Sequence, residues 1–147
     1  DYLVETSFQQ ATLQDERIIS ALHHNNGDIV RISELADNIT KYTHRRVRDD
    51  LVFSEGVNIE LRDMYQLLQD LATATKEVIL TKNVDKLKIV DEIEEKVDKM
   101  RKELVDAHIE RMNAGVCRPA SSNVFINLVN NLERIGDHLT FVAHSIE

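Results

Sequence analysis

The chain has 147 residues, enough for one domain whose core needs neither disulfides nor a structural metal. Its net charge of −8, with acidic residues scattered along the chain, argues against a duplex-binding surface, because such a surface needs a basic stripe; no nucleic-acid partner is expected. Only 4 glycines and 1 proline interrupt a composition that is 42% apolar and 30% charged, which favours helix throughout a globular fold.

Two helices are predicted in the first third of the chain. The first runs from about Tyr2 to His24, and 25–28 (Asn-Asn-Gly-Asp) is expected to stop it, because Asn and Gly tolerate a left-handed backbone. The second runs over about 29–49. The apolar positions expected to face inward on these two helices are Val4, Phe8, Ala11, Ile18, Leu22, Ile32, Leu35, Ile39 and Tyr42. The basic cluster Arg45, Arg46 and Arg48 is interpreted as a solvated helix end.

Three further helices are predicted over about 57–80, 84–113 and 119–147. Ser54 or Asn58 is expected to cap the first of them, and Asn83 to break the chain after it. Gly115 and Pro119 separate the last two. Long amphipathic helices, short loops and no alternating strand pattern predict an all-α fold, an antiparallel bundle of about five helices.

Two carboxylate pairs are the strongest candidates for a binding site. Glu94 and Asp98 are four residues apart on one predicted helix, and Glu133 and Asp137 have the same spacing on the next. Each pair therefore projects from one helix face, and two facing pairs would supply oxygen ligands for a hard cation. Because both pairs lie away from the apolar seams or at their border, any such site is expected at the bundle surface. The competing interpretation is ordinary solvated carboxylates.

Other chemistries find little support. A ferritin-like di-iron site needs Glu-x-x-His motifs, and none of the six histidines has Glu three residues before it. His23 and His24 are interpreted as helix-end residues, His108 as a packing residue, and His138 as exposed or an outer ligand. The single Cys117 excludes an intrachain disulfide and makes a reducing compartment the default. No nucleophile elbow or phosphate loop appears, so no catalytic activity is expected.

The run Asn131–His138, Asn-Leu-Glu-Arg-Ile-Gly-Asp-His, resembles the LERIGDH signature of PhoU-like domains. Residues 93–104 (IEEKVDKMRKEL) and 60–68 (ELRDMYQLL) look like two further helices of that family. The resemblance implies that 57–147 is a complete three-helix PhoU-like repeat.

The same resemblance implies an incomplete first repeat over 1–56. Residues 32–42 (ISELADNITKY) resemble a decayed copy of the signature helix, in which Asp37 corresponds to Asp137 and Ser33 to Glu133. The acidic pair is thus half lost there. The two repeats are expected to form one compact domain.

Members of this family bind metal through such acidic pairs, so the resemblance implies Glu94, Asp98, Glu133 and Asp137 as ligands of a divalent or iron ion. Residues 53–65 look most like the tails of bacterial sodium–phosphate cotransporters, and the chain starts at Asp1 rather than Met, as expected of a piece of a longer protein. The resemblance implies a regulatory or scaffolding domain at the cytoplasmic face of the membrane. Its partner would be the transporter part of the same chain, a phosphate permease or a sensor kinase.

Three alternatives remain open at this point. The chain could be a free-standing PhoU-like regulator or permease accessory, or a generic helical interaction module. The long apolar seam of the last helix also allows a homodimer.

Overall fold

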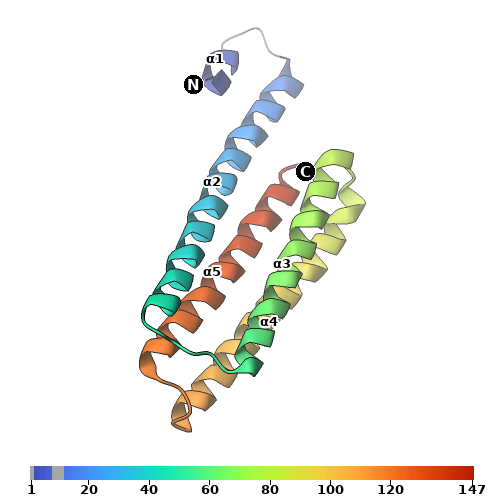
Figure 1. Ribbon diagram of the computed structural model, residues 1–147. Helices are drawn as coiled ribbons and strands as arrows, with labels where there is room; N and C mark the ends of the chain where they lie inside the picture. Colours follow the sequence, from blue (N-terminus) through green and yellow to red (C-terminus); the bar gives the residue numbers. More distant parts are fainter. Residues whose placement is uncertain (1, 8–11) are drawn as a thin grey trace.

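A computed structural model describes residues 2–7 and 12–147 (Figure 1). Its elements are α1 (Tyr2–Ser7), α2 (Leu13–Arg48), α3 (Glu55–Thr81), the short 3-10 helix η1 (Val84–Lys86), α4 (Leu87–Asn113) and α5 (Pro119–His144). The structure is 88% helical, with five α-helices and no strand among the described residues. The prediction of an all-α helical bundle is therefore confirmed.

The prediction of two helices meeting at 25–28 is wrong. A single helix, α2, runs unbroken through Asn25, Asn26 and Gly27, and so His23 and His24 lie inside a helix rather than at its end. The actual start is Thr12, whose side chain accepts a hydrogen bond from the Asp15 amide while the Asp15 carboxylate accepts one from the Thr12 amide. This reciprocal cap fixes the helix start twelve residues or more before the predicted break. The break residues carry no left-handed backbone, because continued helical hydrogen bonding outweighs the weak local preference of Asn and Gly.

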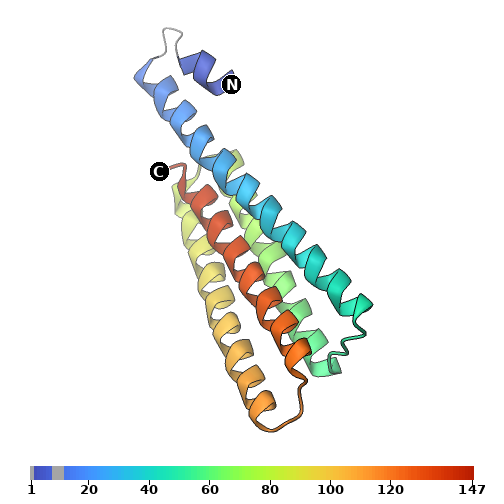
Figure 2. The ribbon, with the colours of Figure 1, turned by 90° about the vertical axis from the view of Figure 1, so that its left-hand side faces the viewer.

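Three described apolar residues of the predicted first helix are not core residues. Val4, Ile18 and Leu22 are exposed, whereas Leu35 further along α2 is fully buried. Phe8 and Ala11 lie outside the described residues. The reason is visible in Figure 2, where the amino-terminal part of α2 projects past the ends of the other helices. At 36 residues α2 is about 54 Å long, against about 40 Å for α3, α4 and α5.

The core lies between α3, α4 and α5. Met64 and Leu71 from α3, Val90 and Val97 from α4, and Phe125 from α5 are each fully buried there. α5 is the central helix: it packs against α2, α3 and α4, whereas α2 packs on α5 and on no other described helix of the bundle (Figure 1). α3, α4 and α5 thus form a three-helix unit, with α2 added against α5. The division into two repeats remains a prediction.

The three connections follow the predicted stop and cap residues. Ser54 caps α3 by accepting a hydrogen bond from the Val57 amide. Lys82 ends that helix in a left-handed conformation, and Asn83 then caps η1. Gly115 has a φ of +71°, the left-handed conformation that glycine adopts at low cost, so its role as the stop after α4 is confirmed. No described helix carries an apolar stretch long enough to cross a bilayer.

Candidate metal centre

Three of the four predicted ligands converge between α4 and α5. Carboxylate oxygens of Glu94, Asp98 and Asp137 lie within 4.8 Å of one another, and this is the one such group of potential ligands in the parts of the chain that the structure describes. Glu94 and Asp98 share one face of α4, one turn apart. Asp137 reaches them from α5, so the group depends on the close packing of two helices.

Gly136 explains how α5 comes close enough. It is buried, and a Cβ built on it would lie 3.3 Å from Leu68 Cδ2 and 3.5 Å from Val97 Cγ1. With only a hydrogen at this position, α5 lies directly against α3 and α4. Asp137, the next residue, is thereby brought beside α4.

The carboxylates lie in a partly buried seam. Glu94 and Asp137 are half-buried and Asp98 is exposed, so the group opens to solvent on the Asp98 side. The prediction that Asp137 and Glu133 lie opposite the buried side of their helix is wrong, because α5 is covered by neighbours on three sides.

This environment shifts the carboxyl groups toward protonation. Burial, and then the nearby Asp98 and Asp137 carboxylates, raise the pKa of Glu94. Burial, and then the Asp98 carboxylate, raise the pKa of Asp137. Both shifts have the sign expected of negative charges held together with too little compensating positive charge. A bound cation would supply that missing charge.

The fourth predicted ligand, Glu133, does not belong to this group of three carboxylates. Its carboxylate lies 3.6 Å from Arg101 Nε on α4, in an ion pair whose members are partly exposed. Burial, and then the Asp137 carboxylate, still raise the pKa of Glu133, while Arg101 opposes the shift. The sequence analysis missed Arg101. Its position on α4, three residues after Asp98, does not indicate that it pairs with Glu133 on α5.

The histidine next to Asp137 belongs to a different contact. His138 Nδ1 lies 2.8 Å from Asp28 on α2, and the His138 ring packs edge-on against Phe141. His138 is therefore partly buried and links α2 to α5, contrary to the expectation of an exposed side chain. Asp28 belongs to the segment that was expected to stop a helix, and it contacts His138 from within α2.

The donor set suits a hard cation. Carboxylate oxygens are the ligands that divalent ions such as Mg²⁺, Mn²⁺ or Ca²⁺ prefer, and iron also accepts them. Three carboxylates from two rigid helices, with solvent access at Asp98, would leave coordination positions for water. Glu133 would join only by leaving Arg101.

The comparison with protein families covers a much longer part of the chain than the acidic group alone. The model of the PhoU domain family matches residues 61–146, which is most of α3 together with all of α4 and α5. No curated protein and no solved structure matches the chain. The matched segment is more than half of the 147 residues and contains all four predicted ligands. The chain belongs to the PhoU domain family.

Proposed function

We propose that this protein regulates phosphate transport by contact with a transport protein, and that a divalent or iron ion held by Glu94, Asp98 and Asp137 stabilises the surface it uses. The observation that carries the metal part is the convergence of these three carboxylates across two helices. The transport part is supported by family membership, since the PhoU domain is a regulatory and non-enzymatic domain associated with phosphate transport.

The structure suggests how an ion would act on this domain. The carboxylates belong to α4 and α5, and α5 also carries the packing of α2. Burial, and then repulsion between the carboxylates, raise the pKa values of Glu94 and Asp137. An ion between α4 and α5 would offset both effects by supplying positive charge, and would hold the two helices in one relative position. A partner that docks on this face would then meet a more rigid surface, so metal binding and docking would be thermodynamically linked.

Metal binding is tested with a double variant and a matched control. Asp98→Asn with Asp137→Asn removes two of the three carboxylates, and the expected loss of affinity for Mn²⁺ or Fe²⁺ is at least about 10–100-fold. Asp106→Asn with Glu110→Gln removes an exposed acidic pair of the same spacing on α4 and should leave affinity unchanged. Calorimetry and elemental analysis after dialysis give the answer. Equal metal content in wild type and the first variant would rule out this site.

The transport role needs a separate experiment. Phosphate uptake is measured in cells that carry the full gene, the gene with the Asp98/Asp137 substitutions, or no gene. Altered uptake on deletion supports the transport role, and unchanged uptake contradicts it whatever the metal result. The reading frame upstream of the codon for Asp1 then separates the two forms of the proposal: membrane-spanning segments there indicate a cotransporter tail, and a nearby start codon indicates a free regulator.

A further inference from the structure

A positive charge continues the row of carboxylates on α4. Glu94, Asp98 and Arg101 follow one another at intervals of four and three residues, the spacing that places side chains on one helix face. α5 packs against α4 and runs in the opposite direction (Figure 2). Asp137 therefore lies beside Glu94 and Asp98. Glu133, one turn earlier on α5, lies beside Arg101.

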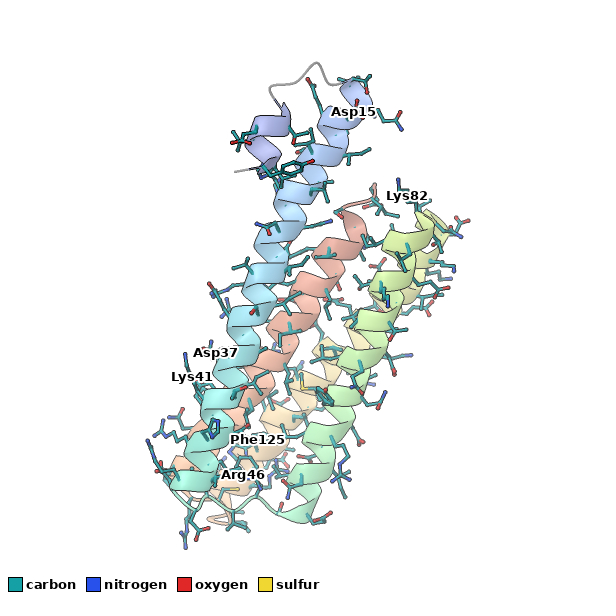
Figure 3. The ribbon with its side chains drawn as sticks, turned by 45° about the horizontal axis from the view of Figure 1, so that its top comes forward. Asp15, Asp37, Lys41, Arg46, Lys82 and Phe125 are labelled. Carbon is teal, nitrogen blue, oxygen red and sulfur yellow. The ribbon has the colours of Figure 1, made fainter. Side chains whose placement is uncertain are left out.

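The contact between Arg101 and Glu133 is partly open to water. Phe125, labelled in Figure 3, lies near the start of α5, and Glu133 follows about two turns further along the helix. Arg101 Nε lies 3.6 Å from Glu133 Oε1 and has no hydrogen-bond partner among the described residues, and the two side chains are 39% and 20% exposed. An exposed ion pair without a hydrogen bond contributes little to stability, so Arg101 can leave Glu133 at low cost.

This ion pair decides how many carboxylates the candidate metal centre offers. While Arg101 holds Glu133, the centre consists of Glu94, Asp98 and Asp137, which carry three negative charges when ionised. Released from Arg101, Glu133 would add a fourth. Affinity for hard cations depends on the number of charged oxygen ligands, and a trivalent ion gains more from a fourth carboxylate than a divalent ion does.

We propose that Arg101 sets the charge selectivity of the candidate metal centre. By pairing with Glu133 it limits the centre to three carboxylates, and so favours a divalent ion over a trivalent one. Arg101 is a positioning residue, because it acts through Glu133 rather than by contact with the ion. The inference rests on the metal site of the proposed function and adds to it the class of ion that the site selects.

The first test compares Mn²⁺ and Tb³⁺ binding by calorimetry in the wild type and two variants. Arg101→Gln should raise the ratio of Tb³⁺ affinity to Mn²⁺ affinity about tenfold or more, because it frees Glu133 as a fourth ligand. Arg101→Lys keeps the positive charge and should leave the ratio near that of the wild type. If the wild type binds Mn²⁺ and Arg101→Gln leaves the ratio unchanged, this inference fails while the proposed metal site stands. Binding of neither ion to the wild type or to Arg101→Gln would overturn both.

Arg134 supplies the matched control. It is an exposed residue next to Glu133, and no ion pair joins it to another residue in the described ranges 2–7 and 12–147. Burial, and then the Asp137 carboxylate, raise the pKa of Glu133, whereas the charges of Arg101 and Arg134 lower it. Arg134→Gln thus removes a nearby positive charge without freeing a carboxylate, so the Tb³⁺ to Mn²⁺ ratio should stay the same. An equal rise of the ratio in Arg134→Gln and Arg101→Gln would contradict the proposal.

A double variant tests whether the effect passes through Glu133. Arg101→Gln combined with Glu133→Gln removes the freed carboxylate together with the arginine, and the ratio should return to the wild-type value. A ratio that stays raised in the double variant would show that Arg101 does not act through Glu133. Circular dichroism of each variant checks the fold, and a loss of stability alone would weaken the binding of both ions without changing their ratio.

Discussion

Gly136 is the residue at which α5 comes closest to its neighbours. A methyl group there would press on the flexible end of Leu68 at 3.3 Å, and a larger side chain would also meet Val97 and Leu71. Gly136→Leu is therefore expected to lower the free energy of unfolding by roughly 1–3 kcal/mol, the usual cost of overpacking. Gly27→Leu is the control, because nothing lies within 4 Å of a Cβ at Gly27. Urea denaturation measures both, and equal stability of the two variants would show that the close approach is not needed.

The charge of Asp137 is expected to destabilise the protein when no metal is present. Its pKa is raised above the ordinary value, so the folded state holds its proton more tightly than the unfolded state does. Stability from this group is therefore greatest at pH values below its unfolded pKa and falls as the pH rises through the folded pKa. Asp137→Asn should raise the free energy of unfolding of metal-free protein at pH 7 by roughly 0.2–0.5 kcal/mol, the size of a like-charge repulsion on a helix surface, because it removes a half-buried charge that the Asp98 carboxylate also repels. Thermal melts with and without Mn²⁺ test this, and a variant less stable than wild type without metal would contradict it.

His144 gives a pH dependence of the same sign, in a higher pH range, because its ordinary pKa is higher than that of a carboxyl group. Its Nε2 lies 2.7 Å from Asp91 on α4 and its Nδ1 lies 2.8 Å from Glu147. The hydrogen bond with Asp91, and then that with Glu147, raise the pKa of His144. The stabilisation is thus fully present below the unfolded pKa and is lost as the pH rises through the folded pKa. His144→Gln should lower the melting temperature at pH 5.5 more than at pH 8.5. His44→Gln, at an exposed site on α2, is the control, and a pH-independent loss would rule out the charged contact.

At the scale of elements, the unbroken course of α2 through 25–28 makes a clear prediction. Gly27 is helical and open to solvent, so Gly27→Ala should stabilise the protein by up to about 1 kcal/mol through helix propensity. Gly115→Ala should do the reverse, because its φ of +71° disfavours a side chain. Circular dichroism and denaturation curves distinguish the two. A loss of stability on Gly27→Ala would indicate the helix break that the sequence favoured.

The other elements were predicted within two or three residues at their ends. The spacing of Val57, Met64 and Leu71 predicts that they share one buried face of α3. All three are buried in the structure. Ser54, Asn83 and Gly115 mark ends that local hydrogen bonding and backbone conformation decide. Where α2 continues, local signals were outweighed by propagation of the helix from the Thr12 cap.

At the scale of the whole molecule, the two ends of α2 differ in how far other helices cover them. Leu35 is its one buried residue among those described, and Leu13, Ile18 and Leu22 toward its start are exposed. Amide hydrogens of residues 13–24 are therefore expected to exchange at least about tenfold faster than those of residues 32–43, as measured by hydrogen exchange with mass spectrometry. Equal protection in the isolated protein would indicate that the projecting segment is covered, for example by a second copy.

The candidate metal centre could be predicted from the sequence only in part. The sequence identified Glu94, Asp98, Glu133 and Asp137 by spacing and by family resemblance, because both depend on residue type and helical period alone. Only the packing of α4 on α5 decided that Glu94, Asp98 and Asp137 converge while Glu133 pairs with Arg101. His108 could be identified as a packing residue, but the contact of its Nε2 with Ser122 depends on how α4 packs on α5.

The all-α class, the courses of α3, α4 and α5, and the candidate ligands could be predicted from residue patterns alone, because hydrophobic period, capping residues and the family motif are local properties. Packing between helices sets the central position of α5 and which polar groups meet. Those features depend on distances between residues far apart in the chain, such as Asp28 and His138, and helical periodicity carries no information about them.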